Sequence, residues 1–183
     1  MVLLVILALV VLLVLWYIAT YNRLIRLKAM MAEAWSGIDV QLKRRYDLIP
    51  NLVETVKGYA RHEEKIFTDL AQMRSRSMGA AGVKEKAAAE NALVEGLRTL
   101  FAVAEAYPDL KANQNFLQLQ RDLAEIEDQL QLARRYYNGT VRNFNVAVQS
   151  IPSSLVAGGM GLKPAEYFEV ESAAVRETPK VSF

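Results

Sequence analysis

The sequence predicts an all-α protein, in which an N-terminal transmembrane helix continues into an antiparallel up-and-down bundle of four long helices. Residues Val2 to Ile18 carry no charge and are mostly Leu, Val and Ile. Apolar residues then recur every three or four positions along nearly all of the chain, which indicates helix. Strong helix breakers are few, and short loops between helices favour antiparallel neighbours. The predicted domains are an anchor over 1–20, a helical bundle over 21–168 and a loose tail over 169–183.

The apolar start of the chain is interpreted as an uncleaved membrane anchor. A helix rises about 1.5 Å per residue, so roughly 17–19 residues just span a hydrocarbon core of about 30 Å. A cleaved signal would begin with basic residues and carry small residues before the cut. Here no basic residue precedes the apolar stretch, and Tyr17 and Ile18 are bulky. A buried core helix is a weaker alternative, because the stretch is apolar on all faces.

The end of the span carries the residues expected at a membrane surface. Aromatic rings favour the headgroup layer, and basic residues favour the cytoplasmic side. The N-terminus is therefore predicted outside and the helical domain in the cytoplasm. The span has no glycine, so it lacks a G-x-x-x-G dimerisation pattern. The predicted interface residues are Trp16, Tyr17, Tyr21, Arg23, Arg26 and Lys28.

Helix-breaking residues and short loops divide the chain after the span into four predicted helices. The first helix runs to about Arg45, and the second begins near Leu48 with Pro50 in its first turn. The third spans 84–107 and is stopped by Pro108. Asn113 is predicted to cap the fourth. The fourth helix carries a coiled-coil-like seam, with a stutter around Tyr137. That seam comprises Phe116, Leu119, Leu123, Ile126, Leu130, Ala133 and Tyr137.

Helix lengths place two segments near the lipid. A continuous first helix puts Lys43 roughly 35 Å beyond Thr20, and a second helix returning over roughly 40 Å brings its tip back. That tip is hypothesised to contact anionic headgroups, with a solvated basic loop as an equal alternative. Its basic residues are Arg74, Arg76, Lys84 and Lys86. The apolar segment after Pro152 would also lie near the bilayer. It could dip into the interface or pack over the end of the bundle, and packing is favoured.

Composition argues against most enzyme classes and against nucleic acid as a partner. The net charge is only +2, cysteine is absent, and the single histidine is His62. No zincin motif follows His62, so no metal site, cofactor site or catalytic residue is predicted.

Two polar clusters carry the remaining candidate residues. Each cluster is read either as hydrogen bonds that fix the helices in register or as a protein-docking surface, with the structural reading favoured. One cluster comprises Asp39, Arg44, Asp47, Asn51, Tyr107, Lys111 and Asn113. The other comprises Arg134, Arg135, Tyr137, Asn138 and Asn145.

Several long blocks of the sequence closely resemble the LemA family. These are residues 34–35, 38–53 and 56–63, then 105–113 with Phe116, and 133–138 with Val141 and Asn145. The resemblance implies a bacterial, membrane-anchored helical bundle with no established enzymatic activity, and a magnetosome relative suggests membrane organisation. The chain departs from the family pattern at Ile151, Ser153, Ser154, Met160 and Leu162.

The resulting functional hypothesis is a non-enzymatic scaffold at the bacterial inner (cytoplasmic) membrane. Its predicted partners are the lipid bilayer, further copies of itself and a membrane protein. The seam of the fourth helix and the two polar clusters are its expected contact surfaces. A sensor or adaptor coupled to a membrane protease or kinase is the alternative. A hydrolase would depend on His62.

Overall fold

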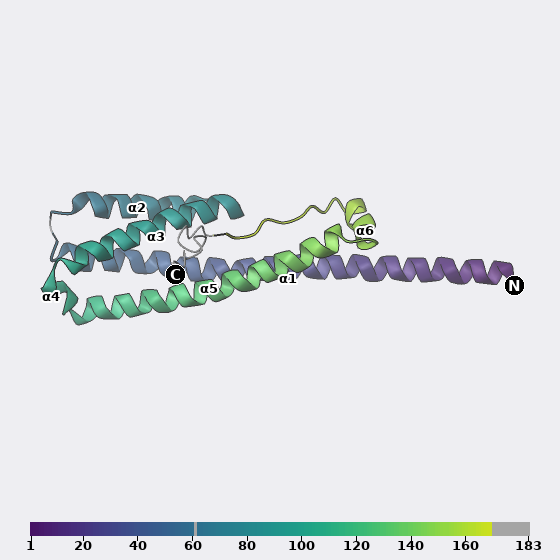
Figure 1. Cartoon of the computed structure of the whole chain (residues 1–183), viewed down its shortest axis with the longest axis horizontal. Helices are drawn as coiled ribbons and strands as arrows, with labels where there is room; N and C mark the ends of the chain where they lie inside the picture. The colour runs from purple at the N-terminus through teal and green to yellow at the C-terminus, as the bar shows by residue number, and fades with distance from the viewer. Residues whose placement is uncertain (61, 170–183) are drawn as a thin grey trace, which may run out of the picture. The chain divides into compact units, whose positions relative to one another are not determined.

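The computed structural model describes residues 1–60 and 62–169, and within these residues the chain forms six helices and no strand. They are α1 (Val2–Lys57), α2 (Glu64–Gly79), α3 (Val83–Glu105), α4 (Pro108–Lys111), α5 (Gln114–Gln149) and α6 (Ser153–Gly159), as Figure 1 shows. The all-α prediction is confirmed for this part of the chain. The chain divides into two compact units. The first unit is Met1–Gln41 with Gln129–Tyr167, and the second is Leu42–Asp128 with the described residues from Phe168 onward.

Helix α1 continues through Pro50, so the predicted start of a new helix near Leu48 is wrong. Pro50 is exposed, whereas Ile49, Leu52 and Val56 are buried and extend the apolar face of α1 beyond it. Proline has no N–H, so the carbonyl of Tyr46, four residues earlier, lacks its usual partner inside the helix. The Arg74 side chain of α2 supplies one, because its Nε donates to the Tyr46 carbonyl oxygen at 2.7 Å. The helix therefore tolerates a residue that usually breaks it.

Helix α2 is shorter than expected because α1 takes the residues up to Lys57. Its 16 residues rise about 24 Å, well below the predicted 40 Å. Helices α2 and α3 lie side by side (Figure 1). Gly96 of α3 permits this close approach, since a Cβ at that position would lie 2.7 Å from the Met73 sulfur.

Helix α5 begins as the sequence predicts. The Asn113 Oδ1 accepts the Phe116 N–H at 3.1 Å, which caps the helix. Most of the predicted seam and its continuation are buried, so this stripe packs inside the chain and is not available to a partner. The buried members are Phe116, Leu123, Ile126, Leu130, Tyr137, Val141, Phe144 and Val148.

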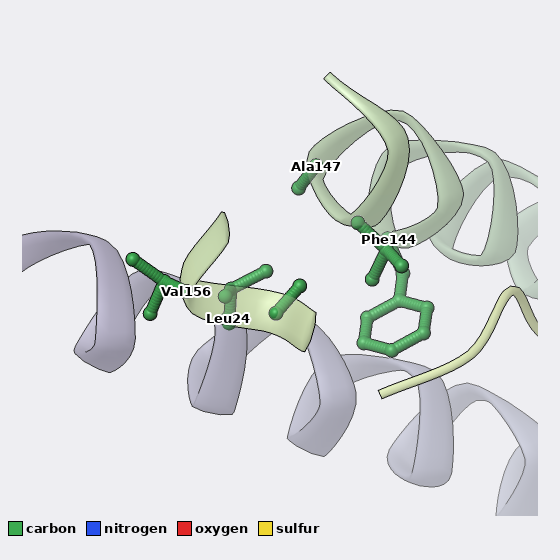
Figure 2. Close-up of a cluster of buried hydrophobic side chains, with 6 residues drawn as sticks. Leu24, Phe144, Ala147 and Val156 are labelled. Carbon is green, nitrogen blue, oxygen red and sulfur yellow. The ribbon is translucent and has the colours of Figure 1, made fainter. Parts of the chain in front are cut away.

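The core of the first unit joins α1, α5 and α6. Figure 2 shows Leu24 of α1, Phe144 and Ala147 of α5 and Val156 of α6 meeting in one buried cluster. Met160 and Leu162, two of the departures from the family pattern, pack against this cluster. The expectation that the segment after Pro152 packs on the helices is therefore confirmed.

Candidate functional site

The apolar start of α1 is uncovered. Within the described residues, α1 is the one helix that is long and apolar enough to cross a membrane. Its most apolar 18-residue window has a mean hydropathy of 3.2, and none of that window is buried. A core helix would be covered by the rest of the chain, so the exposure of this window argues against that alternative. Thr20, at 9% exposed, is the first buried residue of the chain.

The six predicted interface residues form an exposed band on α1 that begins inside this window and extends beyond its end. Trp16, Tyr17 and Tyr21 are all exposed, and the rings of Tyr17 and Tyr21 lie 6.5 Å apart between centroids. The basic residues Arg23, Arg26 and Lys28 follow and are exposed as well. Their role at a membrane surface stays a prediction.

Two residues of the second polar cluster hold the segment that follows α6. Asn145 of α5 donates through Nδ2 to the Ala165 carbonyl at 2.9 Å, and its Oδ1 accepts the Ala165 N–H at 2.7 Å. The Tyr137 hydroxyl donates to the Glu166 carbonyl at 3.1 Å. We call the segment that follows α6 the arm, and we call Asn145 and Tyr137 the arm clamp. Because both residues bond backbone groups of the chain itself, the geometry fits the structural reading of this cluster.

Tyr137 is held on a second side by an aromatic contact. Its ring meets Trp35 of α1 edge to face, with 5.2 Å between centroids. Burial, and secondly the Glu166 carboxylate, raise the pKa of Tyr137 above its ordinary value of 10.0. The phenol therefore stays neutral and able to donate at neutral pH. In the same cluster Arg134 and Asn138 are half-buried and Arg135 is exposed.

The second unit contains a buried group of charges that the sequence analysis missed. Arg45 is 0% exposed and pairs with Glu90, which is also fully buried. The Arg45 Nη1 also pairs with Glu127 Oε1 at 2.6 Å. Glu90 accepts a further hydrogen bond from the Tyr46 hydroxyl. We call Arg45, Glu90, Glu127 and Tyr46 the charged cluster, and it joins α1, α3 and α5.

A sequence signal for the charged cluster existed. On α1, the buried residues Ile38, Leu42, Arg45, Ile49, Leu52 and Val56 follow alternating steps of four and three. Glu90 falls at the same kind of position on α3, between buried Ala87 and Leu93. Opposite charges at core positions of two helices predict pairing, because an unpaired buried charge is strongly unfavourable.

The first polar cluster is dispersed, not gathered into one site. Arg44 and Asp47 line a surface hollow of about 340 Å³ with Asp122 and Glu125. Asp39, Asn51 and Lys111 are exposed. The Tyr107 carbonyl accepts the Leu110 and Lys111 N–H groups at the start of α4. Besides capping α5, Asn113 donates through Nδ2 to the Tyr59 hydroxyl at 2.9 Å.

The described residues offer no metal site. Among them no group of three or more His, Cys, Asp or Glu side chains could hold a metal ion. His62 is exposed in the connection between α1 and α2.

Two residues of the predicted lipid-contact loop bond backbone groups of the second unit. Besides the Arg74 bond to Tyr46, the Lys86 Nζ donates to the Ser77 carbonyl at 2.9 Å. Arg76 and Lys84 are exposed. Lipid contact by these four residues stays a prediction, and the short α2 removes the length argument on which it rested.

Comparison with known proteins gives relatives of two kinds. Magnetosome protein MamQ 1 of Paramagnetospirillum magneticum is 25% identical over 188 residues, which cover 88% of this chain and 68% of the relative. Magnetosome protein MamQ of Magnetospirillum gryphiswaldense is 24% identical over 189 residues, with the same coverage of 88% and 68%. Protein LemA of Metamycoplasma hominis is 25% identical over 154 residues, which cover 84% of this chain and 70% of the relative.

The family model agrees with these relatives. The model of the LemA family matches residues 34–183, which is well over half of the chain. The matched range includes the arm clamp, the charged cluster and the α5 cap. This chain therefore belongs to the LemA family.

Proposed function

We propose that this protein is a membrane-anchored, non-enzymatic scaffold of the bacterial inner membrane that self-assembles or recruits a membrane protein. The observation that carries the proposal is the start of α1, whose most apolar window has no buried residue and continues into the rest of the helix without a break. Exposed apolar residues of this number are unfavourable in water, so a lipid environment is their natural surrounding. The remaining helices form an antiparallel bundle on this anchor, with its N-terminus outside and the helices in the cytoplasm.

Two further observations support a role without catalysis. Arg45 and Glu90, whose side chains are fully buried, pair with each other in the interior of the second unit. The relatives named as magnetosome proteins support a role at a cellular structure and carry no enzyme name. Both observations are consistent with a protein that works by binding.

Self-assembly requires an exposed surface, and the outer face of α5 offers one in place of its buried seam. Leu132, Tyr136 and Val146 are 52%, 54% and 56% exposed. Gly139 lies between them, and a Cβ there would meet nothing within 4 Å. Their spacing keeps these residues on one face of a helix. A second copy of this chain is the occupant that the scaffold proposal assigns to this face.

Particle size in mild detergent tests the proposal, measured with and without residues 1–20. A large closed assembly is expected in both forms, and Tyr136→Asp should reduce it to smaller particles. Leu117→Asp is the matched control, since Leu117 is an exposed apolar residue of the same helix about 22 Å along the axis from Leu132. A persistent monomer that binds one defined membrane protease or kinase would favour the sensor or adaptor instead. Loss of function in a folded His62→Ala variant would favour a hydrolase.

A further inference from the structure

Helix α6 lies beside the point where the exposed part of α1 ends. Val156 and Ala157 of α6 are buried in the same cluster as Leu24 of α1. Leu24 is one helical turn beyond Thr20, the first buried residue of the chain. The start of the covered part of α1 therefore coincides with α6, and Figure 2 shows Val156 close to Leu24 on the α1 ribbon.

Apolar side chains are exposed on the turn that leads into α6 and on the side of α6 that does not face the cluster. Ile151 is 86% exposed and Leu155 is 74% exposed, which makes them the two most exposed large apolar side chains outside the predicted span among residues 1–60 and 62–169. Pro152, between them, is exposed as well. We call Ile151, Pro152 and Leu155 the foot. Bulky side chains exposed next to one another on a short turn indicate a surface that meets an apolar environment.

The surrounding sequence is suited to an interfacial position. Residues 143–162 form a stretch of twenty residues without a charge, bounded by Arg142 and Lys163. Burying this segment in the headgroup and acyl boundary would desolvate no ionised side chain. On α1, Arg23 and Arg26 lie on either side of Leu24 and are exposed, where anionic headgroups attract basic residues.

The foot is also held firmly by the rest of the first unit. The Ser153 Oγ donates to the Ala147 carbonyl at 2.6 Å, which fixes the start of α6 to α5. On the far side of α6, Asn145 bonds both backbone groups of Ala165. A segment tied at both ends in this way presents Ile151 and Leu155 already exposed. This rigidity lowers the entropy lost when they enter another phase.

We propose that the foot inserts into the headgroup layer of the same bilayer face from which α1 emerges, as a second membrane contact. The occupant is a lipid surface, and the proposal rests on the anchoring role of α1. The aromatic residues Trp16, Tyr17 and Tyr21 mark this layer on α1 about one or two turns before Leu24. The foot then opposes tilting of α1, since tilting would pull its apolar side chains into water.

The absence of native cysteine permits a direct test on the full chain. Four single-cysteine variants are each labelled with an environment-sensitive fluorophore and reconstituted into vesicles of phosphatidylcholine and phosphatidylglycerol. The variants are Leu155→Cys, Ile151→Cys, Leu132→Cys and Leu9→Cys. These vesicles carry lipids with a quencher near the headgroup or deep in the acyl chain. Leu132 is the matched control, because it is an exposed leucine of α5 about 22 Å along the helix from Ala147.

The expected result is several-fold stronger shallow quenching at positions 151 and 155 than at position 132, with deep quenching at position 9. Equal, weak quenching at 151, 155 and 132 with deep quenching at position 9 overturns the foot and leaves the anchor in place. Absence of lipid quenching at all four positions overturns both the anchor and the foot. Since Leu155 and Ile151 are largely exposed, neither substitution removes core packing.

Discussion

The interiors of the two compact units are stabilised by different kinds of interaction. The first unit relies on an apolar cluster around Leu24 and on neutral side-chain amide and hydroxyl groups that bond backbone. The second unit places a fully buried arginine and glutamate among its leucines. Removing one neutral hydrogen bond leaves the other bonds in place. Removing either partner of a buried ion pair leaves the other charge buried and unpaired. The units should therefore respond differently to single substitutions.

The largest expected effect is in the charged cluster. Arg45→Met leaves Glu90 buried without its counter-charge, and we expect a loss of about 3–5 kcal/mol in the free energy of unfolding. Denaturation followed by circular dichroism in mild detergent measures it. Arg44→Met is the control, because Arg44 is exposed and surface charges contribute only about 0–1 kcal/mol. Equal effects of the two substitutions would contradict the importance of the buried pair.

The apolar cluster of the first unit should lose stability through packing alone. Leu24→Ala removes a side chain that is 1% exposed, and cavities of this kind cost roughly 2–5 kcal/mol. Its neighbour Ile25 is 44% exposed, so Ile25→Ala should cost far less. The same denaturation measurement compares them. If Ile25→Ala were the more damaging, the packing of α6 on α1 would be wrong.

The arm clamp should show a smaller and more local effect. Asn145→Asp keeps an acceptor for the Ala165 N–H but loses the donor to the Ala165 carbonyl, and an unsatisfied group of this kind costs about 1–3 kcal/mol. Hydrogen exchange over residues 160–167 should rise, while exchange in the second unit stays unchanged. Asn143→Asp, at an exposed position of the same helix, should leave that exchange unaltered.

Within the second unit, the bond from Arg74 to Tyr46 is expected to depend on Pro50. Arg74→Met should cost about 1–3 kcal/mol, since it removes the hydrogen bond that the Tyr46 carbonyl accepts from Arg74. Pro50→Ala supplies a backbone N–H to that carbonyl, so Arg74→Met should cost less in the Pro50→Ala background. A double-mutant cycle measures this coupling. Identical costs in both backgrounds would refute the compensation.

The smallest expected effect concerns the pH dependence of the first unit. The pKa of Tyr137 is raised in the folded chain, so the stability it contributes is complete below about pH 10 and decreases as the pH rises further. Tyr137→Phe should flatten this decrease in the melting temperature, although it also removes a hydrogen bond at every pH. Exposed Tyr136 serves as the control, and Tyr136→Phe should leave the alkaline decrease as it is.

Local sequence signals predicted the parts of the fold that depend on neighbouring residues. The Asn113 cap, the extent of α3 and the spacing of the apolar stripe of α5 can be read within a few positions of the chain. Periodicity is strongest in such segments. The burial of that stripe inside the chain was not predicted, because the stripe was expected to contact partners. The candidate site was predicted to the same degree: Asn145 and Tyr137 were named from the sequence, but their partners at Ala165 and Glu166 were not.

The errors arise where a distant residue decides the outcome. Pro50 indicates a break by its local chemistry, and the partner that the Tyr46 carbonyl then needs comes from Arg74, which follows 24 residues later. The same error concealed Arg45. With a helix ending at Arg45, its charge looks like an ordinary basic residue in a last turn. With α1 continuous to Lys57, it stands at a core position and requires the buried Glu90.

The bond between Arg74 and Tyr46 also has a consequence for the order of assembly. During synthesis the whole of α1 leaves the ribosome before α2 does, and at that stage the turn preceding Pro50 lacks one of its hydrogen bonds. The turn is completed only when α2 returns and presents its guanidinium. The final residues of α1 are therefore fully stabilised only after α2 has packed against them.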